Sequence, residues 1–249
     1  MSDTAEARPS STVILARAAE DAPELLMVRR HASSSFGGAW VFPGGVLDND
    51  DEAAAERCGS LSAETANATL AVDAGGLAYF SAAIRELFEE TGILLADAET
   101  PDAATIRSDL LDGSRPWSEL VAERDVKLSL PALCYISHWI TPRVLPKRYS
   151  TRFFIAEYTG RAEPNACGGE VLDCRWLSAH RALELAERGH IELHLPTQIT
   201  LQGLVRHKNV QTLMQWARCQ ADQGVPCIFP ELPEERAVLE AVARGGRQE

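Results

Sequence analysis

The chain has 249 residues, is 45% hydrophobic and carries a net charge of −12, so it can bury one large core with appendages. This acidic balance argues against nucleic acid as a partner, because contacts to a phosphate backbone need basic surface. The sequence has no run of eighteen apolar residues, so we expect no membrane-spanning helix. The six cysteines form no Cys-x-x-Cys pair, which is typical of reduced thiols in a cytoplasmic protein.

The N-terminal part of the chain predicts a short tail followed by strands. Residues 1–10 are polar and lack the apolar segment of a signal peptide, so we expect a disordered tail. Ser11–Ala18 and Leu25–Arg30 are predicted strands, and Trp40–Phe42 resumes strand character after a Ser- and Gly-rich loop. Arg29 and Arg30 are candidates for binding substrate phosphate; the alternative is that a strand-end arginine only solvates the edge.

Residues 46–75 form a candidate helical insertion. Asp50 and the two acidic residues after it are typical of a helix start, and the alanines that follow favour a helix. Gly75 and Gly76 then separate this segment from the next helix.

The next helix is acidic on one face. Leu77, Phe80, Ile84, Leu87 and Phe88 form one apolar stripe with helical spacing. Glu86, Glu89 and Glu90 lie on another face, and Gly92 offers the left-handed position that ends a helix. The alternative is a solvated acidic face. Three carboxylates within one turn repel each other, however, and a hard cation such as Mg²⁺ would reverse that repulsion.

The second half of the chain predicts a further helical insertion and then the remaining sheet. Residues 97–131 contain two segments with helical spacing, and strands and helices follow them. The predicted helices are Asp102–Leu111, Pro116–Arg124, Ala179–Arg188 after the N-cap Ser178, a long amphipathic helix from Pro196 to about Gln220, and Glu234–Ala243. The predicted strands are Leu133–Thr141, Thr151–Tyr158 and Val171–Leu177. This order predicts an α/β fold with a mixed sheet between helical layers, in one domain over 11–230 with a helical tail over 231–249.

A basic segment lies between two of these strands. Its four cations in ten residues are Arg143, Lys147, Arg148 and Arg152. In an acidic protein they are candidates for binding substrate phosphates, and the alternative is pairing with the protein's own carboxylates. The neighbouring aromatic residues Trp139, Tyr149 and Phe153 could stack on an adenine or belong to the core.

The stretch Arg85–Ile93, which reads Arg-Glu-Leu-Phe-Glu-Glu-Thr-Gly-Ile, resembles the second half of the box that marks the Nudix hydrolases. Gly44 and Gly45 resemble the turn of its first half. In the family's usual spacing the Arg would be at position 59, so 26 residues are inserted here, and Asp51 stands where a Glu is usual. This split box resembles the branch of the superfamily that includes the peroxisomal acyl-CoA diphosphatase.

The resemblance implies an α/β/α sandwich and a divalent-metal site. It implies that Glu86 and Glu90 bind Mg²⁺ or Mn²⁺, with Glu89 completing the metal shell and the backbone of Gly45 close to the ion. Arg85 is expected to orient a carboxylate. Family members place the general base on different glutamates, and Glu170 is the candidate here; the alternative is an exposed loop glutamate.

Three functions remain open at this point. The first is a diphosphatase of CoA or acyl-CoA, the second a diphosphatase of ADP-ribose or of dinucleotides such as NADH, and the third a Nudix-fold binding or regulatory protein without turnover. In all three the partner is a small nucleotide-derived molecule. The insertion over 46–75 is expected to form a wall or lid over the substrate's non-nucleotide end, or part of a homodimer contact.

Overall fold

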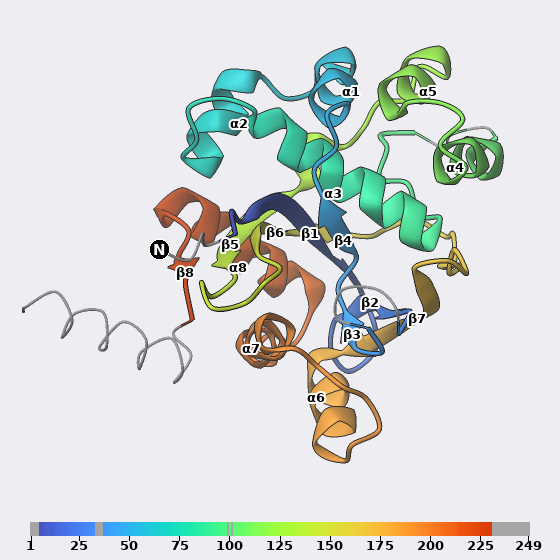
Figure 1. Ribbon diagram of the computed structural model, residues 1–249. Coiled ribbons are helices and arrows are strands. Elements are labelled where there is room, and N and C mark those ends of the chain that lie inside the picture. Colours follow the sequence, from blue (N-terminus) through green and yellow to red (C-terminus); the bar gives the residue numbers. More distant parts are fainter. Residues whose placement is uncertain (1–4, 33–36, 99, 101, 231–249) are drawn as a thin grey trace, which may run out of the picture.

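A mixed eight-stranded sheet runs through the described part of the protein. The computed structural model describes residues 5–32, 37–98, 100 and 102–230 (Figure 1). The strands are β1 (Arg8–Arg17), β2 (Glu24–Arg30), β3 (Trp40–Val41), β4 (Gly44–Val46), β5 (Cys134–Ile140), β6 (Tyr149–Glu157), β7 (Val171–Ser178) and β8 (Cys227–Ile228). Their order is β3-β2-β1-β6-β5-β8, with β4 paired to β1 and β7 paired to β2.

Strand β1 lies at the centre and changes partner along its length. Its first half pairs with β4, whereas its end pairs with β2 in a short hairpin. On its other side β1 pairs with β6 in parallel over nine residues. Strands β4 and β2 therefore pair with successive parts of the same edge of β1, and the Gly44–Gly45 backbone belongs to the first of them.

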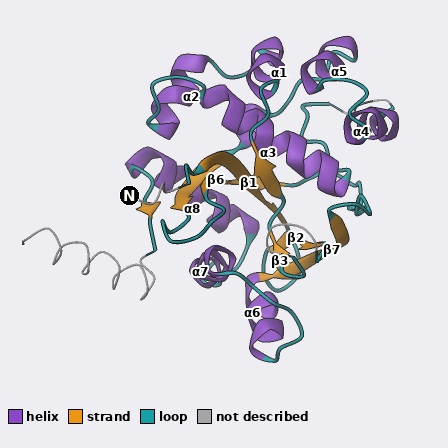
Figure 2. Cartoon of the chain, viewed as in Figure 1, coloured by secondary structure: helices purple, strands orange, loops and turns teal. Residues whose placement is uncertain are grey.

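The sheet lies between two layers of helices (Figure 2). One layer holds α1 (Asp51–Cys58), α2 (Ala63–Leu70), α3 (Gly76–Thr91), α4 (Ala103–Leu111) and α5 (Trp117–Glu123). The other holds α6 (Ala179–Glu187), α7 (Leu195–Leu204) and α8 (Val210–Gln223). A 3₁₀ turn, Leu130–Ala132, leads into β5. Each layer closes one apolar cluster against the sheet, around Phe88 and Phe154 on one face and around Ile14 and Met214 on the other. This arrangement confirms the predicted α/β/α sandwich.

Helix α3 is bounded by two glycines and is buried along most of its length. Gly75 and Gly92 both have a φ of 74°, which glycine adopts without strain, and the Gly92 N–H closes the helix on the Phe88 carbonyl. Glu90 is 2% exposed, so the last turn is not a solvated acidic face. The acidic residues are therefore held by groups within the protein.

Most of the insertion over 46–75 packs into the core, and its helices contribute no residue to the large cavity described below, so they form no wall or lid over it; the dimer contact stays a prediction. Its helices α1 and α2 pack on α3, and they bury Asp51 together with several small and apolar side chains. These buried side chains are Ala54, Ala55, Cys58, Ala66 and Leu70. Gly76 makes this packing possible, because a Cβ there would overlap the backbone of α2 at Ala66.

Two predicted boundaries differ from the structure. Strand β1 begins at Arg8, whose N–H bonds the Arg148 carbonyl, so the predicted tail over 1–10 is wrong at its end. The long helix from Pro196 to Gln220 is wrong as one unit: α7 ends at Leu204 and α8 starts at Val210, where the Asn209 side chain caps the N–H of Thr212 at 2.9 Å. The predicted helix Glu234–Ala243 lies outside the described residues. The strands Thr151–Tyr158 and Val171–Leu177 are confirmed within one or two residues at most boundaries.

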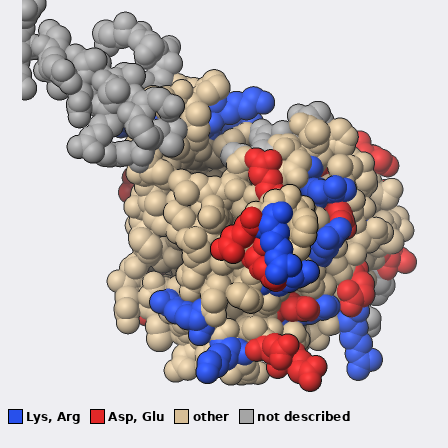
Figure 3. Space-filling model, turned by 90° about the horizontal axis from the view of Figure 1, so that it is seen from below, with Lys and Arg blue, Asp and Glu red and all other residues tan. Residues whose placement is uncertain are grey.

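In the described part of the chain no helix is both long and apolar enough to cross a membrane. The face in Figure 3 carries Lys and Arg side chains among Asp and Glu side chains. That face is not the continuous basic surface that a phosphate backbone requires.

Candidate active site

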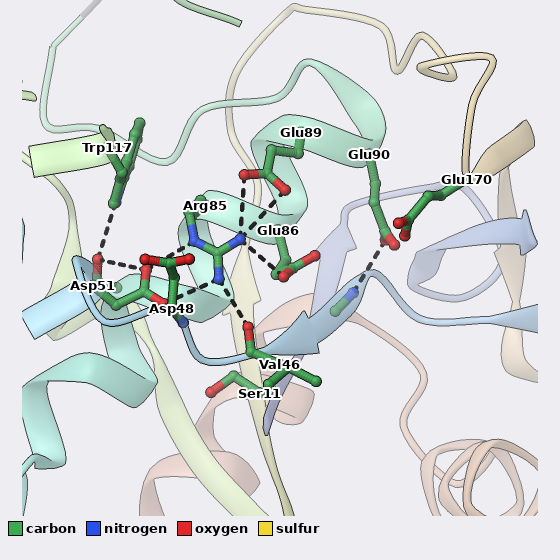
Figure 4. Close-up of polar contacts among 12 residues, drawn as sticks. Ser11, Val46, Asp48, Asp51, Arg85, Glu86, Glu89, Glu90, Trp117 and Glu170 are labelled. Carbon is green, nitrogen blue, oxygen red and sulfur yellow. Dashed lines mark hydrogen bonds and ion pairs between the residues drawn. The ribbon is translucent and has the colours of Figure 1, made fainter. Parts of the chain in front are cut away.

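Arg85 is the centre of a buried ion-pair network at the middle of α3 (Figure 4). Its Nε and Nη2 donate to the two carboxylate oxygens of Asp51, at 2.9 and 3.0 Å. Its Nη1 lies 2.9 Å from Glu86 and 3.2 Å from Glu89, and Nη2 also donates to the Val46 carbonyl at 2.9 Å. One guanidinium thus joins α1, β4 and three carboxylates, which fixes the directions of Glu86 and Glu89.

Arg30 plays the corresponding part for Glu90. Its Nη2 lies 2.7 Å from Glu90 Oε1 and also donates to the Gly44 carbonyl. The second oxygen of Glu90 accepts the Gly44 N–H at 3.1 Å. The Glu90 side chain is only 3% exposed, so both of its oxygens are held inside the protein.

The backbone of β4 passes directly over the acidic helix. A Cβ on Gly45 would overlap the Glu86 carboxylate, and a Cβ on Gly44 would overlap β1 at Ser11 and Thr12. At Gly44 the overlap is with backbone atoms, so glycine is required there, whereas a side chain at Gly45 would displace the Glu86 carboxylate from its place.

Burial and mutual repulsion raise the pKa values of the clustered carboxylates. Burial is the main cause in each case; it raises the pKa of Glu89 to about 7 and that of Glu90 to about 8, and nearby Glu86 adds to both. The pKa of Glu86 is raised for the same reason. Burial also raises the pKa of Asp51, against the opposing effect of Arg85. The arginines therefore only partly offset the cost of gathering these negative charges.

The donor set fits a hard divalent cation in its chemistry. Glu86, Glu89 and Glu90 offer carboxylate oxygens from the same helix, and Gly45 offers a backbone that no side chain shields. Among the described residues no three Asp, Glu, His or Cys side chains are already gathered as a metal cluster. Arg85 holds the carboxylates of Glu86 and Glu89, and Arg30 holds that of Glu90.

A cavity of about 790 Å³ opens beside this network. Its polar end contains Arg30, Gly44, Gly45, Arg85 and Glu86. Its other wall comes from β5, β6, the loop between them and the start of α7, and it is largely apolar. The wall residues include Trp139, Ile140, Pro142, Leu145, Phe153, Leu195 and Pro196. A cavity of this size lies within the range for small-molecule sites.

The structure brings only one of the four predicted basic-segment residues to the cavity, namely Lys147. Arg143 is exposed and Arg148 donates to the Thr141 and Ala5 carbonyls; neither lines the cavity. Arg152 is buried and points to the α3 side of β6, where it lies over the Tyr79 ring at 4.6 Å. Its neighbours along β6, Thr151 and Phe153, line the cavity, because successive side chains of a strand point to opposite faces.

Of the two neighbouring arginines at the end of β2, only Arg30 lines the cavity. Arg29 is exposed and lies outside it. Successive side chains of a strand point to opposite faces, and Arg30 lies on the α3 side of β2, where it meets Glu90.

Glu170 lies at the cavity, across from the end of α3. Its side chain is 73% exposed, its Oε2 is 3.5 Å from Arg30, and its carbonyl accepts the His31 N–H at 2.7 Å. Figure 4 shows its carboxylate next to that of Glu90. The position is compatible with the predicted role as a base, and that role stays a prediction.

One cavity residue, Arg8, and one residue of the buried network behind the cavity, Asp51, were missed by the sequence analysis. Arg8 lines the cavity from the start of β1, in a stretch predicted to be a tail. Asp51 was noted only as a departure from the expected glutamate, yet it is the main partner of Arg85. The spacing of Asp51 from Gly45 is the signal that could have identified it.

Comparisons with known proteins agree with this geometry. The family model of the NUDT19 Nudix domain matches residues 61–204, more than half of the chain. A protein named nudix hydrolase 7 from Caenorhabditis elegans is 23% identical over 224 residues, covering 87% of this chain; the chain spans 65% of that protein's length. The crystal structure of a Nudix hydrolase from Alicyclobacillus acidocaldarius superposes with a TM-score of 0.72 at 28% identity, covering 84% of this chain and 96% of the other.

These matches confirm the resemblance drawn from the split box. The motif, the α/β/α sandwich and the family model point to the same branch. The chain therefore belongs to the Nudix hydrolases, within the family of the NUDT19 Nudix domain.

Proposed function

We propose that this protein is a divalent-metal-dependent diphosphatase that hydrolyses the pyrophosphate of a nucleoside diphosphate linked to another group. We propose CoA or an acyl-CoA as its substrate. The observation that carries the proposal is the meeting of Glu86 and Glu90 with the Gly44–Gly45 backbone at the polar end of a cavity. Arg30, at the same end, supports the proposal as a cation for the diphosphate.

We assign phosphate binding to one group of residues around the cavity and metal binding to another. Arg8, Arg30 and Lys147 line the cavity and are the proposed partners of the phosphate oxygens. Glu86, Glu89 and Glu90 would hold Mg²⁺ or Mn²⁺, which supplies charge neutralisation for the phosphates and a lowered pKa for water.

Arg85 and Glu170 complete the proposed chemistry. Arg85 keeps Glu86 and Glu89 in one orientation through its hydrogen bonds. Glu170, exposed at the cavity, is the proposed acceptor of the proton from the attacking water.

The apolar wall supports a substrate with a long, weakly polar arm. Ile140, Leu145 and Leu195 line the cavity, and Leu145 and Leu195 are 40% and 46% exposed. A pantetheine arm or an acyl chain would cover such side chains when the diphosphate lies at the polar end. The second candidate is ADP-ribose or a dinucleotide such as NADH, favoured by the aromatic residues Trp139, Tyr149 and Phe153 in the same wall.

Hydrolysis assays with defined substrates test the proposal. The purified protein is incubated with CoA, an acyl-CoA, ADP-ribose and NADH, each with Mg²⁺ and with Mn²⁺. We expect CoA or the acyl-CoA to give adenosine 3′,5′-bisphosphate and the phosphopantetheine product, and EDTA to stop the reaction reversibly. Absence of cleavage of all four substrates with either metal would contradict the proposed activity.

The setting of this activity is also a proposal. We propose a cytoplasmic location, supported by six cysteines that are all free thiols.

A further inference from the structure

Arg107 on α4 links the second helical insertion to the end of α3. Its Nε and Nη2 both donate to the Glu89 carbonyl, at 3.1 and 2.9 Å. Its Nη2 also donates to the Asn165 carbonyl at 2.7 Å. One side chain therefore joins three segments that are far apart in the sequence: α4, the last turn of α3 and the segment after β6.

The end of α3 is shaped to receive this guanidinium. A Cβ on Gly92 would lie 2.9 Å from Arg107 Nη1, closer than unbonded side-chain atoms normally come. Gly92 therefore serves Arg107 as well as the left-handed turn. The last carbonyls of a helix carry partial negative charge and lack helical partners, so a cation is favoured there.

The segment held by Arg107 leads to Glu170. The Asn165 N–H donates to the Thr91 carbonyl at 2.7 Å, which gives a second bond between this segment and α3. Five residues later the Glu170 carbonyl is fixed by the His31 N–H at 2.7 Å. The segment between these two anchors is thus tied to α3 at one end and to β2 at the other.

Arg107 itself is separate from the substrate cavity. It is not among the described residues that line it, and in the described part of the chain it forms no ion pair with a carboxylate. Its three hydrogen bonds within the described part of the chain all go to backbone carbonyls. Such a residue can set the positions of other groups without contacting the substrate.

We propose that Arg107 is a positioning residue for the active site. It holds the α3 turn that carries Glu89 and Glu90 in register with the 165–170 segment that carries Glu170. This inference rests on the proposed function, since it assumes that these glutamates perform the hydrolysis. The second insertion then has a specific role, because its helix α4 carries the arginine that holds the end of α3.

The test compares Arg107→Ala, Arg107→Lys and the control Arg124→Ala. Arg124 lies in the same insertion with an exposed ion pair to Asp102 at 3.4 Å. With CoA and Mg²⁺, well below each melting temperature, we expect Arg107→Ala to lower kcat by about 10- to 100-fold, because a displacement near 1 Å has that effect. KM should change less than about 2-fold, since Arg107 does not line the cavity. Arg107→Lys should recover part of kcat, and added guanidinium should partly restore Arg107→Ala.

Hydrogen exchange of the whole protein provides a readout that does not need turnover. In Arg107→Ala the amides of 165–170 should exchange faster, while Arg124→Ala should leave them unchanged. An unchanged kcat in folded Arg107→Ala, or an equal loss in Arg124→Ala, would overturn the inference. If the wild-type protein cleaves no diphosphate, the proposed function fails. The positioning role of Arg107 is then tested by hydrogen exchange alone, and unchanged exchange rates over 165–170 in Arg107→Ala would overturn it.

Discussion

Asp51 and Arg85 are 34 residues apart in the chain and form a bidentate ion pair, at 2.9 and 3.0 Å, with side chains that are 0% and 8% exposed. Asp51 is the first residue of α1, near the start of the inserted segment, and Arg85 lies on α3 after its end. The pair restores in space the connection that the insertion interrupts in the sequence. Helices α1 and α2 of the insertion both pack on α3, so the inserted segment stays close to the helix that follows it.

Asp51→Asn removes the charge from this pair while keeping its size. We expect it to lower the free energy of unfolding by about 3 kcal/mol, because one partner of a buried ion pair is left uncompensated. Urea unfolding measures the change. Glu56→Gln, an exposed site on the same helix, serves as the control and should have little effect. A loss no larger than in that control would show that Asp51 does not hold Arg85.

Lys147 and Arg152 should respond differently to alanine. Lys147 lines the cavity, so Lys147→Ala should raise KM by about 10-fold, a loss of roughly 1.4 kcal/mol, with a smaller effect on kcat. Arg152 is buried against Tyr79 and His138, so Arg152→Ala should lower the melting temperature and leave KM nearly unchanged. Steady-state kinetics and thermal unfolding separate the two. A raised KM only in Arg152→Ala would reverse the assignment.

His138 makes the stability of the fold depend on pH. Burial, together with the charge of Arg152 at 3.0 Å, lowers the pKa of His138 from 6.5 to about 4. The unfolded chain therefore binds this proton more readily than the folded protein. The contribution of neutral His138 to the free energy of unfolding is fully present above pH 6.5 and is lost as the pH falls to about 4. In His138→Gln the free energy of unfolding should fall less across this window. Equal pH dependence in wild type and variant would contradict this origin.

The metal site makes a prediction about stability as well. An ion that binds the folded protein near Glu86 and Glu90 stabilises it by mass action and relieves the repulsion among the carboxylates. Millimolar Mg²⁺ should therefore raise the melting temperature, and EDTA should reverse the change. A melting temperature that stays flat over millimolar Mg²⁺ would count against a metal site on these residues.

The sequence was informative where one local pattern determines the structure. The helical spacing of Leu77 to Phe88 and the two glycines at its ends predicted α3, and the glutamates near its end indicated the site. The Gly-Gly pair predicted a close approach to the acidic helix, which the overlap at Gly45 explains.

Side-chain directions on the strands depended on pairing that the sequence does not show. Of Arg29 and Arg30 only Arg30 faces the cavity, and the alternation of side chains along β6 turns Arg152 away from the cavity while Phe153 faces it. Contacts over long sequence distances were also beyond local patterns. Arg107 reaches Glu89 and Asn165 only because the fold brings α4 to the end of α3.

The sequence contains a residue that marks the break between α7 and α8, but the continuous amphipathic spacing favoured a single helix. Asn209 is a preferred N-cap residue, and it starts α8 by accepting the Thr212 N–H. The apolar stripe continues across the break because both helices pack on the same face of the sheet, at Leu201 and Leu213. Periodicity alone therefore predicted one helix where the chain forms two.

The measurement that tests the account most directly is the rate of CoA hydrolysis by Glu90→Gln at saturating Mg²⁺. The variant keeps the size of the side chain and an oxygen for the Gly44 N–H, so it should fold, and Glu187→Gln on the exposed face of α6 is the matched control. We expect kcat to fall by about 10²-fold or more in Glu90→Gln, because a divalent ion needs that negative charge, and to be unchanged in Glu187→Gln. A folded Glu90→Gln protein with a rate close to that of the wild type would contradict the assignment of this helix as the metal-dependent active site.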